Sequence, residues 1–308
     1  MLFTLLKRCL RSKSISFNDY EYHEILTIHD WKRCVKKYFT CTNLPWLSKY
    51  NALIKDIYEL YNDIPFHNQK HVYDVFQLGV CLLVHNRNYL KSLTDTQKFT
   101  YCIALLCHDL DHKGQTNAEI KERGNIHEYD YEYEEDEFYG LNREYVQRQS
   151  SYESLSSLCS STSYNERHHI TCANRLLRKH KIVYDEELFM KLISFTDLVV
   201  HNTFMNKKKS EEEELLVLFM KLADIGHIVR KWDIHIDFVT ALNSERQFPL
   251  NPKKLPEDTL WFNNNFVLPL IEKTKEFNDD MYNDLIFLYR VNEKKWLSMD
   301  NNMINKCL

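Results

Sequence analysis

Histidine and aspartate side chains recur at short, regular spacings in four segments of the chain. His67 and His71 lie four residues apart in FHNQKHVYDV, and this spacing predicts that both imidazoles share one helix face. His108 and His112 repeat the spacing in CHDLDHKGQTN, directly after an apolar run. Two further segments add acids and imidazoles: Glu166, His168, His169, Asp224. Burying so many ionisable groups costs several kcal/mol for each unpaired ion, a cost that a bound divalent metal offsets.

Each of these pieces alone has an ordinary structural interpretation. A lone histidine on an apolar face is usually a hydrogen-bonded core residue, and a lone aspartate after an apolar helix is usually a cap. Two imidazoles and two carboxylates together suit Zn²⁺, and a shared carboxylate can bridge to a second, harder ion. The joint pattern therefore predicts a hydrolytic metal site with coordination positions left for water.

The order and wording of these motifs resemble the catalytic domain of the class I 3′,5′-cyclic-nucleotide phosphodiesterases. The matching stretches are HNxxHxxDV, HDxDHxGxxN, ExHH, FTD and ADIxH, and they span roughly residues 45–300. The resemblance implies a compact, all-helical domain. It also implies hydrolysis of cAMP, cGMP or both to the 5′-monophosphate, by a hydroxide that bridges two metals.

The resemblance further implies a role for individual residues at the metals. The ligands of the tight metal, usually Zn²⁺, would be His71, His108, Asp109 and Asp224. Asp109 would also bridge to the second metal, usually Mg²⁺ or Mn²⁺. His67 would be the general acid, oriented by Glu245, which stands 21 residues after Asp224 (245 − 224). Residues matching positions around the metal waters are His112, Glu166 and Thr196, and those matching structural polar positions are Asn117 and Asp197.

The purine side of the site departs from the family pattern. Leu242 and Phe262 match the two apolar walls that clamp the purine, but Thr259 stands where the family carries the purine-binding Gln. The family's Q-G-D segment is also missing before Phe262. His227 occupies a substrate-binding position that often holds Asn, and Phe66 replaces the usual Tyr. Nearby amides that could supply the purine bond instead are Gln247, Asn263, Asn264 and Asn265.

Two other functions remain open at this stage. One is a different metal phosphohydrolase of the HD type, acting on nucleotides or alarmones, which needs the ligand quartet but not DHxGxxN. The other is a nucleotide-sensing pseudoenzyme that keeps metals for folding and has lost turnover, an idea motivated by Thr259 and the missing Q-G-D segment.

The elements that must position these groups are helices. With 5 Gly and 6 Pro in 308 residues, tight turns are scarce, and neither a P-loop nor a dinucleotide-binding motif occurs. Helical periodicity predicts an all-α domain over 46–300, between a peripheral segment at 1–45 and a tail at 301–308. Thr94 is the expected N-cap of a helix that runs to Cys107. About 122–150 forms an acidic surface insertion, either an inert loop, a lid or a contact for a basic partner.

Composition limits the partners and the compartment. The charge is 40 − 44 = −4, which argues against nucleic-acid binding. The 9 cysteines are odd in number and include no CxxC pair, so we expect reduced, mostly buried thiols in the cytoplasm. No apolar run is long enough for a transmembrane helix. The apolar and basic N-terminus, MLFTLLKRCLRSK, leaves a weak membrane contact as an alternative to a frayed start. Oligomeric state is not predicted.

Overall fold

The computed structural model describes residues 27–123, 163–206, 212–246 and 251–299, and all regular structure in these ranges is helical. The elements before residue 206 are α2 (Ile28–Cys41), α3 (Tyr50–Leu60), α4 (Gln69–His85), α5 (Asp95–Cys107), α6 (Asn117–Arg123), α8 (Tyr164–Lys179), α9 (Glu186–Ser194), η3 (Leu198–Val200) and α10 (His201–Met205). Those that follow are α11 (Glu212–Ile225), η4 (His227–Val229), α12 (Trp232–Glu245), η5 (Pro252–Lys254), α13 (Leu255–Phe262), the π-helical turn η6 (Asn263–Val267), α14 (Leu268–Thr274) and α15 (Asp279–Leu297). This agrees with the predicted all-α class.

Helix α4 is the central element of the fold. Its N-cap is Asn68, whose side-chain oxygen accepts hydrogen bonds from the backbone N–H groups of Lys70 and His71. Every residue from His71 to Leu83 is buried, because α4 packs against α2, α5 and α11. A helix that is enclosed on all sides fixes the direction of its first turn, where His71 lies.

Helix α5 delivers the next candidate ligands. Thr94 forms a capping box with Gln97, so the predicted N-cap is confirmed. The helix is buried from Phe99 to Cys107 and ends there, which leaves His108 and Asp109 at its C-terminal end. The apolar body of α5 thus anchors the start of the HDxDH motif.

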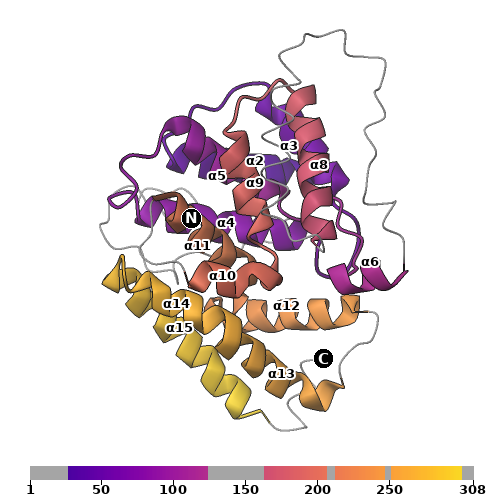
Figure 1. The fold of residues 1–308 in the computed structure, drawn as a ribbon, viewed down its shortest axis with the longest axis vertical. Coiled ribbons are helices and arrows are strands. Elements are labelled where there is room, and N and C mark those ends of the chain that lie inside the picture. The colour runs from indigo at the N-terminus through magenta and orange to yellow at the C-terminus, as the bar shows by residue number, and fades with distance from the viewer. Residues whose placement is uncertain (1–26, 124–162, 207–211, 247–250, 300–308) are drawn as a thin grey trace.

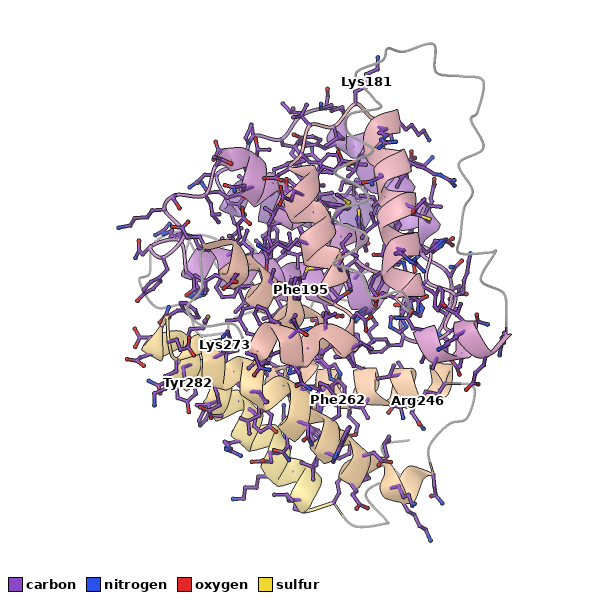
Figure 2. The ribbon with its side chains drawn as sticks, in the orientation of Figure 1. Lys181, Phe195, Arg246, Phe262, Lys273 and Tyr282 are labelled. Carbon is purple, nitrogen blue, oxygen red and sulfur yellow. The ribbon has the colours of Figure 1, made fainter. Side chains whose placement is uncertain are left out.

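The helices form two groups in space. Figure 1 shows α2–α11, from indigo to salmon, above a layer of α12–α15 drawn in orange and yellow. The two groups contact each other where α11 packs on α14 and where η4 packs on α15. Figure 2 places Phe262, Lys273 and Tyr282 in the lower layer and Phe195 in the upper group, at the lower end of α9.

The segment predicted to be peripheral, residues 1–45, includes a helix that packs into the core. Helix α2 belongs to the main hydrophobic core, where Trp31, Val35 and Phe39 are almost fully buried. Its aromatic residues contact α3 and α4 through ring pairs such as Trp31–Tyr58 and Trp31–Tyr73. The charged residues of α2 lie on the side that faces solvent, and its apolar residues lie on the buried side. The mixed charges of this segment therefore do not mark it as peripheral. Residues 1–26, most of the acidic insertion and the tail at 301–308 lie outside the described residues.

Two expectations about cysteines and membranes concern the described part of the chain. Cys81, Cys102 and Cys107 are buried as predicted, and no described cysteine takes part in a disulfide. No helix in the described ranges is both long enough and apolar enough to cross a bilayer. The N-terminal stretch proposed for membrane contact falls among the residues that the structure does not describe.

Candidate metal centre

Four side chains from three helix ends converge on one point. His71 lies in the first turn of α4, His108 and Asp109 follow α5, and Asp224 lies in the last turn of α11. One ligand atom from each residue lies within 4.8 Å of all the others. His71 Nε2 is 3.3 Å from Asp109 Oδ2 and 3.5 Å from Asp224 Oδ1. The corresponding distances from His108 Nε2 are 3.0 and 3.4 Å.

The hydrogen bonding of this quartet fits a divalent metal. His71 Nε2, His108 Nε2 and Asp109 Oδ2 are buried and lack a hydrogen-bond partner among the described residues. His108 Nδ1–H donates to the Leu105 carbonyl at 3.1 Å, which directs the Nε2 lone pair toward the centre. Unpaired buried polar atoms are costly, so three of them facing one point fit the ligand set of a cation.

The electrostatics of the quartet lead to the same conclusion. Burial lowers the pKa of His108, but the Asp109 and Asp224 carboxylates outweigh it and raise that pKa to about 10. Burial alone would raise the pKa of Asp224, but the two imidazoles outweigh it and bring that pKa to about 2. The imidazoles likewise lower the pKa of Asp109, so both acids are ionised at neutral pH, and a metal ion would take over the positive charge that protonated imidazoles supply.

A buried ion pair fixes the position of Asp224 relative to α4. The Arg230 guanidinium contacts the Asp74 carboxylate at 2.7 Å and also donates to the Asp74 backbone carbonyl at 3.1 Å. Asn292 on α15 donates to the carbonyls of Ile228 and Arg230, at 2.6 and 2.7 Å. These contacts hold the chain that follows Asp224, and no local sequence signal pointed to them.

His67 and Glu245 form a pair at the edge of the quartet. His67 Nδ1–H donates to Glu245 Oε1, and the backbone N–H groups of Phe66 and His67 donate to Oε2 at 2.7 and 2.9 Å. These hydrogen bonds outweigh the effect of burial and lower the pKa of Glu245. The backbone of Gly114 adopts φ = +71°, and a Cβ there would lie 3.4 Å from Glu245 Cγ, so glycine suits this close approach.

The prediction that His67 and His71 share one helix face is wrong. Helix α4 begins at Gln69 because Asn68 caps it, and His67 lies in the preceding turn. The two rings are still close, with centroids 5.8 Å apart and an interplanar angle of 82°. In this perpendicular arrangement the His71 ring faces the other quartet residues, whereas the His67 ring faces Glu245.

His112 and His169 continue the row of imidazoles. The His112 ring stacks on His67 at 3.8 Å and lies 5.5 Å from His169. His169 Nδ1–H donates to the Leu110 carbonyl, and its buried Nε2 lies 3.8 Å from Asp109 Oδ1. The sequence analysis gave His169 no role, although the second His of ExHH was a visible signal.

The other residues predicted around the metal waters lie on the adjoining elements. Glu166 on α8 accepts a hydrogen bond from Asn117 Nδ2 at 3.0 Å. Burial and the nearby Asp197 carboxylate raise the pKa of Glu166 to about 8. Asp197 accepts from Ser163 Oγ at 2.5 Å, whereas the Thr196 hydroxyl donates to the Ile193 carbonyl of α9 at 2.7 Å.

A chain of hydrogen bonds sets the orientation of His227. Trp296 Nε1–H donates to His235 Nε2 at 2.7 Å, so His235 must carry its proton on Nδ1. That Nδ1–H donates to His227 Nδ1 at 2.8 Å. Burial lowers the pKa of His227 to about 3, and the neutral ring must then carry its proton on Nε2. His227 thus has a fixed N–H donor, and its ring lies 6.4 Å from that of Phe66.

The two residues predicted to clamp the purine, Leu242 and Phe262, pack in different parts of the domain. Leu242 packs with Phe66, Ile234 and Phe238, whereas Phe262 joins the main core and stacks on Phe266 at 5.1 Å. Figure 2 shows Phe262 in the α12–α15 layer. The two walls thus belong to separate apolar clusters of the described chain, and a shared clamp stays a prediction.

The amides near the missing Gln differ in what they contact. Thr259 is half-buried on α13. Asn264 accepts from the Tyr289 hydroxyl, and Asn265 of η6 donates to the Trp261 carbonyl at the end of α13. Asn263 is buried, and the described residues offer its amide no partner. Gln247 lies outside the described residues.

An all-helical domain with a buried His/Asp quartet and an adjacent His–Glu pair has the makings of a metal-dependent hydrolase. Residues 66–133 match the family model described as 3′5′-cyclic nucleotide phosphodiesterase. A cGMP-specific 3′,5′-cyclic phosphodiesterase delta of Plasmodium falciparum is 27% identical over 61% of the chain. A dual 3′,5′-cyclic-AMP and -GMP phosphodiesterase 11A of Takifugu rubripes is 23% identical over 78%.

The fold agrees with these sequence matches. Two crystal structures of the phosphodiesterase domain of the rhodopsin phosphodiesterase of Salpingoeca rosetta superpose with TM-scores of 0.68 and 0.70, both at 18% identity. Each covers 96% of this chain, and the chain covers 97% and 94% of those domains. Together, the family model, the relatives and the fold support a class I cyclic-nucleotide phosphodiesterase domain. The chain spans only 23% and 28% of the length of the two relatives named above.

Proposed function

We propose that this domain hydrolyses 3′,5′-cyclic nucleotides, cAMP or cGMP or both, to 5′-monophosphates. The observation that carries the proposal is the quartet with its unpaired, buried ligand atoms, next to a His–Glu pair. Two divalent ions, Zn²⁺ at the tight site and Mg²⁺ or Mn²⁺ at the second, would supply an activated water and neutralise the phosphate charge.

The four residues of the quartet would not all bind the same ions. His71, His108 and Asp224 would bind the tight ion only, and Asp109 would reach both ions. His108 suits this role because its Nδ1–H is already bonded to Leu105. His112, Glu166 and Thr196 would contact waters on the ions.

His67 would act as the general acid. Its Nδ1–H donates to Glu245, so its Nε2 is the atom that can deliver a proton to the leaving 3′ oxygen. The Glu245 carboxylate would hold the imidazole in the orientation that this transfer needs. The His67 side chain is 21% exposed, against 4% for His71, so a substrate can reach it from solvent.

The purine side is the part that we expect to be unusual. His227 would offer its Nε2–H to an acceptor on the purine edge. Thr259, in place of the family's Gln, cannot make the two hydrogen bonds of a glutamine amide. Leu242 and Phe262 would pack against the purine ring. Because the relatives named above include a cGMP-specific and a dual enzyme, both nucleotides are the substrates to test.

The test is metal-dependent turnover of cAMP and cGMP by the purified chain, with Mg²⁺ and with Mn²⁺. We expect hydrolysis of at least one of them, abolished by chelation and restored by adding metal. Guanosine tetraphosphate and deoxynucleoside triphosphates are the comparison substrates, and preferential turnover of these would favour the HD-type alternative.

A pseudoenzyme is the second candidate, favoured by Thr259 at the place of the purine-binding Gln. It predicts saturable binding of a cyclic nucleotide, with loaded metals and no turnover under any of these conditions. Binding measured by calorimetry on the same preparation separates this outcome from an inactive, unfolded sample.

A further inference from the structure

A second group of metal-ligating side chains lies on the other side of the HDxDH turn. Asp111, His168 and Cys172 each offer one ligand atom within 4.8 Å of the other two. None of the three belongs to the quartet, and the proposed reaction uses none of them. The ExHH motif accounts for His168 in sequence, but Cys172 belongs to no motif identified above.

The spacing of the donors matches a tetrahedral zinc site. His168 and Cys172 are four residues apart on α8, so both point from one face of the helix. Cys172 Sγ lies 3.6 Å from His168 Nε2, and Nε2 lies 3.0 Å from Asp111 Oδ2. Bond lengths of about 2.0–2.3 Å to zinc place neighbouring tetrahedral donors about 3.3–3.6 Å apart. The observed separations need little adjustment to reach this geometry.

The Asp111 carboxylate is already oriented for a single bond to a metal. Its Oδ1 accepts hydrogen bonds from Asn62 Nδ2 at 3.1 Å and Lys113 Nζ at 2.7 Å. Its Oδ2 faces His168. The backbone of Asp111 has φ = +60°, in the left-handed region, and this turn directs the side chain toward α8. Carboxylate ligands are usually held in this way by hydrogen bonds to the other oxygen.

The three residues differ in solvent exposure, which bears on how a metal ion would reach them. The His168 side chain is 2% exposed, the Asp111 side chain is 18% exposed, and Cys172 is partly exposed. A metal ion could therefore enter from the side of Asp111 and Cys172, and solvent could supply a fourth ligand.

We propose that Asp111, His168 and Cys172 bind one Zn²⁺ ion, with water as the fourth ligand, at a site separate from the hydrolytic centre. The thiolate ligand selects a soft or borderline ion and disfavours Mg²⁺ and Mn²⁺. Binding releases the thiol proton and the proton between His168 Nε2 and Asp111 to solvent, so the thiolate and the carboxylate balance the charge of the ion. The bound ion fastens the turn containing Asp109 to α8.

Co²⁺ is the probe that separates this site from the quartet. The quartet contains no sulfur, so a thiolate-to-Co²⁺ charge-transfer band in the near ultraviolet reports Co²⁺ bound to a cysteine and not Co²⁺ in the quartet. We expect a saturable band on titrating the metal-free full chain with Co²⁺, and its loss when Zn²⁺ is added. The band should persist in Asp224→Asn, which damages the quartet, so failure of the proposed hydrolysis would leave this result intact.

Three variants test the assignment of the ligands. Cys172→Ser should abolish the band, whereas Cys41→Ala, which removes another partly buried thiol, should leave it unchanged. Asn62→Leu removes a hydrogen bond to the ligating carboxylate and should weaken Co²⁺ binding by about 10–100-fold. A missing band in the wild type, or a band that survives Cys172→Ser, overturns the proposal.

A measurement on the unmodified chain guards against misfolded variants. Iodoacetamide alkylation followed by mass spectrometry should show that Zn²⁺ slows modification of Cys172 and leaves that of Cys41 unchanged. Equal rates for Cys172 with and without Zn²⁺ contradict the site.

Discussion

The metal side and the purine side of the candidate site are built in different ways. On the metal side, His71, His108 and Asp109 extend directly from the ends of two buried helices that pack against each other. On the purine side, the orientation of His227 depends on a hydrogen bond from His235, 8 residues further along the chain. His235 in turn is oriented by a hydrogen bond from Trp296, 61 residues beyond it. The proposed chemistry thus depends on side chains at the ends of packed helices, whereas the proposed recognition depends on a chain of hydrogen bonds from α15 through α12 to His227. We therefore expect substitutions on the first side to change kcat and those on the second to change KM.

Asp109→Asn should have the largest effect, because Asp109 is the ligand expected to reach both metals. Losing several kcal/mol of charge stabilisation corresponds to a decrease of about 10³-fold or more in turnover. Metal content measured by mass spectrometry should fall with activity. Asp95→Asn, an exposed carboxylate in the first turn of α5, is the matched control. Full metal occupancy in Asp109→Asn would show that the bridging assignment is wrong.

His67→Asn should come next, with a decrease in kcat of about 10²–10⁴-fold and unchanged metal content. The reason is that the leaving oxygen loses its proton donor while the quartet stays intact. His29→Asn, on the exposed face of α2, controls for the loss of an imidazole. An unaltered kcat would remove His67 from the mechanism.

Trp296→Phe should act on the purine side alone. It removes the hydrogen bond to His235, so the ring of His227 is no longer held in one tautomer. One hydrogen bond contributes about 0.5–1.5 kcal/mol, and KM should therefore rise about 2–10-fold. Steady-state kinetics on both nucleotides should show little change in kcat. Trp232→Phe is the control, because its ring also contacts His235. A fall in kcat with constant KM would mean that the two sides are not separable.

Thr259→Gln should have the smallest effect, and it tests whether the purine side can be restored. An added amide should lower KM by about 2–10-fold for the preferred nucleotide, on the scale of one hydrogen bond. Thr240→Gln, at a half-buried threonine of α12, serves as the comparison. No change in KM for either nucleotide would show that residue 259 does not face the purine.

The same contrast explains what the sequence could predict. The quartet was predictable because each ligand falls in a short motif at a helix end, and packing of α4, α5 and α11 then brings the motifs together. The contact of His67 with Glu245 was predictable only through the resemblance to the family. The helix face assigned to His67 was wrong, since local periodicity does not reveal that Asn68 caps the helix.

Other features were not predicted. Helix α2 has a regular apolar face, with Trp31, Val35 and Phe39 four residues apart and buried, but the sequence analysis treated the mixed charges around it as a sign of a peripheral segment. The link from Trp296 through His235 to His227 depends on tertiary packing of α15, which no spacing in the sequence encodes. The Asp74–Arg230 pair spans 156 residues for the same reason.

Helix α15 has a consequence for how the protein is made. Asn292 and Trp296 lie near the end of the described chain and support the segment after Asp224 and the ring of His235. A nascent polypeptide still holding residues 279–297 in the ribosomal tunnel cannot complete that segment. Premature termination before Asn292 should therefore yield a product that lacks ordered nucleotide recognition even if its upstream helices have already collapsed.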